Sequence, residues 1–321
     1  RHRLPDRAGV ERVVITVEVP RSLFVHESAS GYLHRVGNAK RRMSPEYLAR
    51  LFQQRSQTRL IRFDEQMVGD ARLTDLSPDL WQRFKTVRSD QDAETLLRKL
   101  GLATADEDGL VKPTVAGVLL ASRHGRRWLP NAYVQAVAYR GTAIRLEPKG
   151  EPYQLDAADI EGPLDRQVIE ACRFVFRNMR VMATKDQGRI DRPQYDMQAV
   201  FEALVNAVAH RDYSIYGSKI RLRLFENRME LYSPGAIANT LDVGSLRYRQ
   251  SARNEAICSL LSKCVLPDQS WLANDRRHMM EKRGEGVPII LDNSERLSGR
   301  EPEYRLIDDA ELLLTIHAAA T

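Results

Sequence analysis

The segment from Asp196 to Asp212, DMQAVFEALVNAVAHRD, places the strongest constraint on the fold of this chain. Apolar residues recur along it at helical spacing, and alanines fill most of the remaining positions, which predicts a helix buried on nearly every side. Three polar residues, Glu202, Asn206 and His210, interrupt that surface. Residues four apart advance only about 40° around a helix of 3.6 residues per turn, so the three side chains point roughly one way.

This polar stripe has two interpretations. Burying a carboxylate, an amide and an imidazole without partners costs on the order of several kcal/mol, so each group must face another, water, a metal or a ligand. In the structural interpretation, Asn206 and His210 bond to nearby backbone groups and Glu202 pairs with an arginine. In the functional interpretation, the three residues form a ligand site. For three groups in register, the two interpretations are about equally supported.

The composition is that of an ordinary globular protein. The 321 residues suffice for two or three domains, and 43% are hydrophobic and 29% charged. The net charge of +6 permits an anionic partner such as nucleic acid, although the arginines are scattered through the chain. Three cysteines without a CxxC pair are typical of reduced thiols in a cytoplasmic protein. No segment reaches the roughly 20 apolar residues of a membrane span, so we expect no membrane partner.

The N-terminal region predicts strands and one helix. Alternation and β-branched residues predict strands at 12–19 and 32–36, with a turn at 37–38. The sequence Ser-Pro-Glu then predicts the start of a helix over 44–55. Four basic residues flank the turn: Arg35, Lys40, Arg41 and Arg42. Such a cluster either contacts phosphates or is simply solvated, and the solvated state is the more common.

The next region is mainly helical. Helices are predicted over 78–87 and 92–100, followed by a hairpin around Asp108-Gly109 and an apolar helix after Thr114. Helices followed by a hairpin fit either a small winged-helix module or a connector. No helix here carries the paired Arg, Asn or Gln side chains of base readout, which favours the connector.

Around the central helix, the pattern mixes strands and helices. The predicted elements are a strand at 133–139, an amphipathic helix from Pro163 to Met179, a polar loop at 187–194, strands at 219–225 and 229–232, and a helix at 254–264. The strand at 219–225 alternates apolar residues with a basic face that we expect to be solvated.

Two glycine segments follow the central helix. Gly235 ends Ser-Pro-Gly, and Gly284 and Gly286 flank Glu285 before a short apolar segment. Glycine allows backbone to approach a ligand closely, so both segments are candidates for a binding site.

These motifs carry a resemblance. The order Glu202-xxx-Asn206, Ser-Pro-Gly and Gly-x-Gly resembles the motifs of the GHKL ATP-binding superfamily. More closely, EALVNAVAHRDYSIYGSKIRLRLFENRMELYSPG resembles the C-terminal module of bacterial RecG-like, ATP-dependent DNA helicase-related transcriptional regulators. GYLHRVGNAKRRMSPEYLARLFQQR is similar to the second half of a Schlafen-type AlbA domain, which precedes the module in that family. The chain has no Walker A motif, so a true helicase motor is not supported.

The resemblance implies an α+β fold in three parts. Residues 1–63 would be the second half of an AlbA-type domain, 64–128 a helical, winged-helix-like connector, and 129–321 a GHKL-like (Bergerat) α/β sandwich. The implied site roles are these: Asn206 as the Mg²⁺ ligand that holds the phosphates of ATP, Glu202 as the base that activates water, His210 and Arg211 as phosphate contacts, Gly235 beside the base pocket, and Gly284 and Gly286 in the loop over the phosphates. Amide and carboxylate oxygens suit magnesium.

The chain departs from the superfamily pattern at two places. Members that bind ATP well carry an aspartate before the glycine for the adenine amino group, whereas Ser233 and Pro234 stand here. The multi-glycine lid is reduced to Gly284-Glu285-Gly286. We therefore expect a weak ATPase at most.

Two functional hypotheses result. The first is a nucleic-acid-associated bacterial transcriptional regulator whose module binds ATP and Mg²⁺ and hydrolyses ATP slowly while the basic cluster contacts DNA. A second copy of the chain, in a homodimer, is a further candidate partner. The alternative is a non-catalytic DNA-binding or dimerising regulator in which the GHKL-like fold is a degenerate scaffold.

Overall fold

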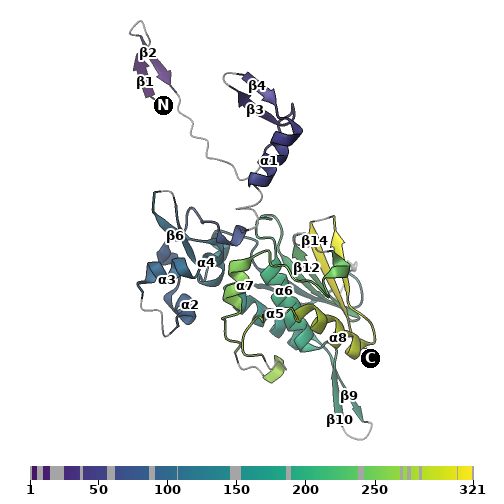
Figure 1. Cartoon of the computed structure of the whole chain (residues 1–321). Coiled ribbons are helices and arrows are strands. Elements are labelled where there is room, and N and C mark those ends of the chain that lie inside the picture. The colour runs from purple at the N-terminus through teal and green to yellow at the C-terminus, as the bar shows by residue number, and fades with distance from the viewer. Residues whose placement is uncertain are drawn as a thin grey trace. The chain divides into compact units, whose positions relative to one another are not determined.

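The computed structural model forms two compact units, Arg1–Ile61 and Arg62–Thr321 (Figure 1). It describes residues 2–5, 10–14, 25–36, 39–55, 62–86, 91–106, 108–144, 153–185, 189–237, 242–267, 270–272, 276–281, 284–308 and 310–319.

The first unit contains two hairpins and a helix. Its elements are β1 (His2–Pro5), β2 (Glu11–Val14), β3 (Leu33–Val36), β4 (Ala39–Arg42) and α1 (Pro45–Arg55). β1 pairs with β2 and β3 with β4, both antiparallel. The predicted helix and the strand at 32–36 are confirmed. The strand predicted over 12–19 is present as far as Val14, while 15–19 and the predicted turn at 37–38 lie outside the described residues.

The second unit begins with short helices around a hairpin. The elements are η2 (Phe63–Glu65), η3 (Leu73–Asp75), α2 (Pro78–Trp81), η4 (Gln82–Phe84), α3 (Ala93–Lys99), β5 (Ala103–Ala105), β6 (Val111–Pro113), α4 (Val115–Leu120) and η5 (Gly125–Arg127). Asp92 caps α3 by accepting from the Thr95 amide at 2.9 Å, and Thr114 caps α4 through the Gly117 amide at 3.0 Å. The predicted hairpin and capped helices are thus confirmed. The helix expected from residue 78 tightens into the 3₁₀ turn η4 instead of continuing.

A six-stranded mixed sheet is the base of the second unit. Its strands are β7 (Val134–Tyr139), β8 (Gln154–Ile160), β11 (Ile220–Leu224), β12 (Arg228–Pro234), β13 (Glu303–Ile307) and β14 (Glu311–His317), in the order β13-β14-β12-β11-β7-β8. β7 and β11 are parallel, and the other neighbours are antiparallel. The predicted strands at 133–139, 219–225 and 229–232 are confirmed.

One predicted loop is wrong. Within the segment 187–194, residues Arg189–Pro193 form β10, which pairs antiparallel with β9 (Val181–Lys185). Figure 1 shows this two-stranded hairpin extending away from the sheet. The strand was obscured because its short sequence, Arg-Ile-Asp-Arg-Pro, has only one β-branched residue among charges and a proline.

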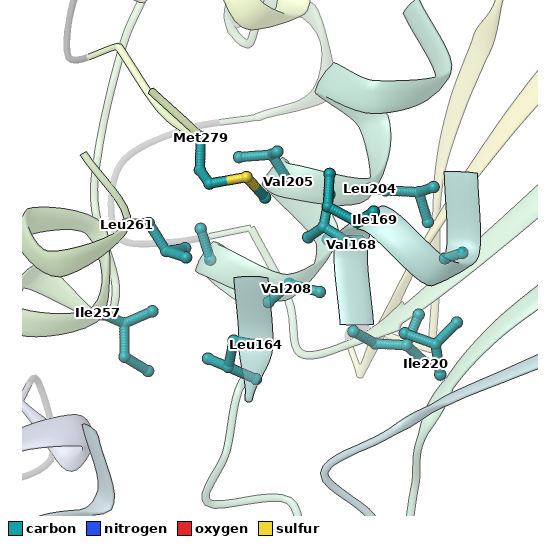
Figure 2. Packing of buried hydrophobic residues seen from close by; sticks show 14 of the residues in the cluster. Leu164, Val168, Ile169, Leu204, Val205, Val208, Ile220, Ile257, Leu261 and Met279 are labelled. Atoms are coloured by element: carbon teal, nitrogen blue, oxygen red, sulfur yellow. The ribbon is translucent and has the colours of Figure 1, made fainter. Parts of the chain in front are cut away.

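The helices cover one face of the sheet. α5 (Leu164–Asn178), α6 (Met197–His210) and α8 (Gly286–Ser298) contact the strands. α7 (Glu255–Leu261) and η7 (Ser270–Leu272) pack against α6, and η6 (Val243–Ser245) lies in the loop before α7. Ile220, Leu222 and Leu224 of β11 point into this layer and are at most 4% exposed. Leu204, Val205 and Val208 of α6 meet Val168 of α5 in the same core (Figure 2). The central helix is therefore buried, as its sequence predicts.

The basic face of β11 lies on the opposite side of the sheet. Arg221 pairs with Glu311, and its guanidinium lies 4.3 Å from the centre of the Tyr232 ring; Arg223 lies 5.1 Å from the same ring. The side chains are half-buried against this ring, so the expected solvated face is instead a network of charge and aromatic contacts. In the parts of the chain that the structure describes, no helix has the length and apolar character needed to cross a membrane.

Candidate functional site

Both ends of α6 are fixed by side-chain hydrogen bonds. Asp196 accepts from the Ala199 amide at 2.8 Å, which satisfies a free donor at the helix start. At the other end, the buried Asn254 donates to the carbonyl oxygens of Ala209 and Arg211 at 2.9 and 2.7 Å. These bonds hold the polar stripe of α6 at a defined position above the sheet.

A cavity of about 350 Å³ adjoins this stripe. Six of the residues singled out in the sequence line it: Glu202, Asn206, His210, Gly235, Gly284 and Gly286. Much of the remaining lining is apolar and comes from the sheet and its loops: Leu231, Ile237, Leu246, Met280, Leu312 and Leu314. The stripe of α6 thus forms a polar wall and these residues an apolar wall, while Arg249, Gln250 and Glu255 also belong to the lining.

Glu202 is a buried acid in the cavity wall. It is 2% exposed, and its Oε1 lies 2.6 Å from Nη1 of Arg276. Burial raises the pKa of Glu202 to about 7, because desolvation outweighs the attraction of Arg276, and the nearby carboxylates of Glu281 and Glu285 act in the same direction. A carboxylate with a pKa near neutrality suits a proton acceptor.

The start of α8 lies directly against Glu202 and Asn206. A Cβ atom added to Gly286 would lie 3.0 Å from Glu202 Oε2 and 3.2 Å from Asn206 Nδ2, so glycine permits this close approach. The first amides of a helix lack intrahelical partners and carry partial positive charge. These donors lie at the same end of the cavity as the carboxylate of Glu202.

The polar wall also suits a magnesium ion in part. The amide of Asn206 and the carboxylate of Glu202 supply oxygen atoms one helical turn apart, and magnesium binds a few such oxygens while keeping several waters. Among the described residues, no group of three or more His, Cys, Asp or Glu side chains is arranged to hold a metal. An ion here would depend on the ligand and water for most of its coordination.

His210 and Arg211 have different surroundings. Burial lowers the pKa of His210 to about 4, with Arg253 contributing, so the imidazole is neutral at pH 7. Its buried Nδ1 has no hydrogen-bond partner among the described residues. Arg211, expected to contact phosphate, lies outside the cavity lining: its guanidinium donates to the carbonyl of Ser218 at 2.6 Å and lies 4.6 Å from the Tyr213 ring centre. Arg211 thus holds the loop after α6.

The Ser-Pro-Gly turn closes the apolar end. Gly235 has φ +116° and its amide donates to the carbonyl of Ala310 at 2.7 Å. A Cβ atom at Gly235 would lie 2.6 Å from Asp212 Cβ, so both the space and the backbone angle require glycine. The Ser233 hydroxyl donates to the carbonyl of Ala207 at 3.1 Å. Its oxygen keeps lone pairs for accepting a hydrogen bond.

The basic cluster of the first unit lies on the β3–β4 hairpin. Arg35 pairs in register with Lys40, and Leu33 with Arg42, so Arg35, Lys40 and Arg42 share one face. The other face carries Arg41 and His34, whose ring lies 4.9 Å from that of Tyr47 in α1. All four basic residues are exposed.

Sequence reasoning missed Arg276, the partner of Glu202. It lies in the segment Arg-Arg-His-Met-Met, which has no helical or strand periodicity and no spacing relation to the stripe of α6. Its contact with Glu202 depends on how the folded chain brings residue 276 to α6, and no local sequence pattern indicates this.

The helices on one face of a mixed sheet, with a cavity between α6, α8 and the glycine segments, define an α+β fold. Residues 217–316 match the family model described as "Putative ATP-dependent DNA helicase recG C-terminal". The match includes β11, β12, α8 and β14, and it begins after α6.

A solved structure supports the fold over most of the chain. The DIP2311 protein from Corynebacterium diphtheriae is similar with a TM-score of 0.52 and 19% sequence identity, over 91% of this chain and 54% of that one. The chain thus spans about half the length of that protein, and at this identity the likeness concerns the fold alone. Comparison with curated proteins gives no match.

Proposed function

We propose that this protein is a nucleic-acid-associated bacterial regulator whose module, residues 129–321, binds ATP with Mg²⁺ and hydrolyses ATP slowly. The observation that carries the proposal is the cavity of about 350 Å³ that joins the Glu202, Asn206 and His210 stripe to the two glycine segments. The match of residues 217–316 to a helicase-related C-terminal family model supports it.

In this proposal, some residues of the cavity bind the nucleotide and Glu202 takes part in its hydrolysis. The apolar wall takes the base, with Ser233 as a hydrogen-bond acceptor, and the start of α8 with Asn206 takes the phosphates. Magnesium, when bound, neutralises charge on the phosphate oxygens. Glu202 accepts a proton from the water whose oxygen bonds to the γ-phosphorus, while the bond from that phosphorus to the bridging oxygen breaks, giving ADP and inorganic phosphate.

Residues 1–63 supply the nucleic-acid contact in this proposal, as the second half of an AlbA-type domain, with 64–128 as the connector. The supporting observation is the exposed face of β3–β4 that carries Arg35, Lys40 and Arg42, with the exposed Arg41 on the opposite face. A basic β-ribbon can bind the phosphates of nucleic acid.

The test of nucleotide binding is thermal denaturation with and without Mg-ATP at millimolar concentration, on the wild-type chain and on Asn206→Ala and Glu202→Ala. Binding to the native state raises stability by RT ln(1 + [L]/Kd), about 2.7 kcal/mol at a hundredfold excess over Kd. We expect a magnesium-dependent increase in Tm that is lost in Asn206→Ala. No increase in the wild type at any concentration would refute nucleotide binding.

A second candidate function is the non-catalytic regulator in which α6 is a scaffold. The buried pair of Glu202 with Arg276 favours it, because the guanidinium already balances the charge of that carboxylate within the protein. In this case Asn206→Asp lowers the Tm of the free protein, and ATP changes neither variant nor wild type. If Asn206→Asp instead abolishes a nucleotide effect without lowering the Tm, the scaffold function is excluded.

A further inference from the structure

Arg276 forms a buried ion pair with the acid of the cavity. Its Nη1 lies 2.6 Å from Glu202 Oε1, and the two side chains are 9% and 3% exposed. A buried ion pair is commonly no more stabilising than apolar residues of similar volume, because desolvation offsets the attraction. Stability alone is therefore a weak reason for an arginine at this position.

The two carboxylate oxygens of Glu202 have different neighbours. Oε1 contacts Arg276, whereas Oε2 lies at the start of α8, where a Cβ on Gly286 would be 3.0 Å away. Glu202 lines the cavity, and the lining formed by the described residues does not include Arg276. The guanidinium thus holds the carboxylate from outside the cavity.

The negative charges around Glu202 require a counter-charge that keeps its carboxylate in place. Glu281 and Glu285 act on Glu202 as like charges, and Glu281 also lines the cavity. A phosphate chain in the cavity would add further repulsion. Without a fixed counter-charge, the carboxylate would turn away from the cavity or draw in a cation of its own.

We propose that Arg276 is a positioning residue: it binds Oε1 of Glu202 so that Oε2 stays directed to the water that attacks the γ-phosphorus. This role rests on the proposed function, specifically on hydrolysis with Glu202 as the base. Arg276 itself touches neither the nucleotide nor the water, and the reaction it serves is the balanced hydrolysis given above. Its removal therefore slows turnover and leaves nucleotide binding in place.

The experiment compares Arg276→Gln, Arg276→Lys and Glu202→Gln in the full chain, together with the double variant. Arg277→Gln is the matched control, because Arg277 is the adjacent arginine and is exposed. Two quantities are measured for each: kcat from phosphate release with Mg-ATP, and Kd for a non-hydrolysable ATP analogue. The second measurement also shows whether each variant is folded.

We expect Arg276→Gln to lower kcat about a hundredfold, near the loss in Glu202→Gln, with Kd unchanged. Arg276→Lys, which keeps the charge, recovers part of the loss, and Arg277→Gln behaves as the wild type. The double variant is no slower than Glu202→Gln alone, because Arg276 acts only through Glu202.

Three results would overturn the inference. Wild-type turnover in Arg276→Gln would show that Arg276 does not position the base. A large rise in Kd alongside the loss of turnover would make Arg276 a binding or folding residue. A wild-type protein that binds the analogue but releases no phosphate would refute the hydrolytic part of the proposed function, and this inference with it, while nucleotide binding would stand.

Discussion

Asp64 accepts a hydrogen bond from the Ile257 amide at 3.0 Å and is fully buried, and this burial raises its pKa to about 6. The native carboxyl group therefore keeps its proton to a higher pH than the unfolded chain, whose aspartates titrate near pH 3.9. The contribution of Asp64 to the free energy of unfolding accordingly falls as the pH rises from about 4 to about 6. A shift of roughly two pKa units corresponds to about 3 kcal/mol.

Asp64→Asn should consequently be more stable than the wild type at pH 7.5, and the difference should shrink at pH 4.5. Asparagine keeps the carbonyl oxygen that accepts from Ile257 but carries no charge to desolvate. Urea denaturation at both pH values measures the difference, with Asp70→Asn, an exposed position, as the control. An equal difference at the two pH values would contradict the prediction.

Gly235 occupies a backbone position that a side chain would strain. Its φ of +116° and the approach of Asp212 Cβ both exclude a side chain, so Gly235→Ala should lower the free energy of unfolding by about 2 kcal/mol. Gly217→Ala is the matched control, because an added Cβ there meets nothing within 4 Å and the φ is not in the left-handed region. Urea denaturation of both variants gives the comparison. Equal stability of the two would show that the turn at Gly235 adapts.

Among the elements, the β3–β4 hairpin carries the proposed nucleic-acid contact. Replacing Arg35, Lys40 and Arg42 together with glutamine should weaken DNA binding for all sequences alike and reduce the slope of log Kd against log salt by about 3, one unit per lost phosphate contact. The measurement is fluorescence anisotropy with duplex DNA at several salt concentrations. A control with the same change in net charge replaces three exposed cations of the second unit: Arg98, Lys99 and Arg277. A control that weakens binding as much would refute a contact at β3–β4.

The elements also show which parts of the fold the sequence could predict. α6 follows from its sequence because periodic apolar residues and alanines leave one narrow polar stripe, and the capping residues Asp92 and Thr114 mark α3 and α4 in the same local way. β10 is a counterexample: pairing with β9 makes it a strand, although its sequence is mainly polar. β8, β13, β14 and the length of α8 were likewise not predicted, because their positions depend on partners distant in sequence.

The residues of the candidate site were likewise predictable from the sequence only where local spacing determines their positions. Glu202, Asn206 and His210 share a helix, so their common direction follows from their spacing. That Gly235, Gly284 and Gly286 reach the same cavity follows only from the resemblance, and Arg276 follows from neither.

For the second unit as a whole, one hydrophobic core runs from the connector into the helix layer. The same cluster contains Leu102 and Leu119 from the connector (64–128), Val168 and Val208 from the helices, and Leu222 from the sheet. Such a core should unfold in a single cooperative transition.

The three tryptophans of the chain permit a test, since Trp81 and Trp128 report on the connector and Trp271 on η7. Two variants, one keeping only Trp81 and the other only Trp271, should give coincident urea transitions by fluorescence. Circular dichroism of both variants provides the control for secondary structure. Transitions at separate urea concentrations would show that residues 64–128 fold as an independent domain.

The hydrogen bonds of Asp64 and Asn254 connect the beginning of the second unit, through α7, to the end of α6. Asp64 holds the amide of Ile257 in α7, and Asn254, just before α7, holds the last carbonyls of α6 beside His210. An opening of α7 therefore releases the end of α6 as well. Under native conditions, the hydrogen of the Ile257 amide should exchange no faster than the core opens. Ligand binding at Asn206, more than 40 residues away in sequence, should slow that exchange further.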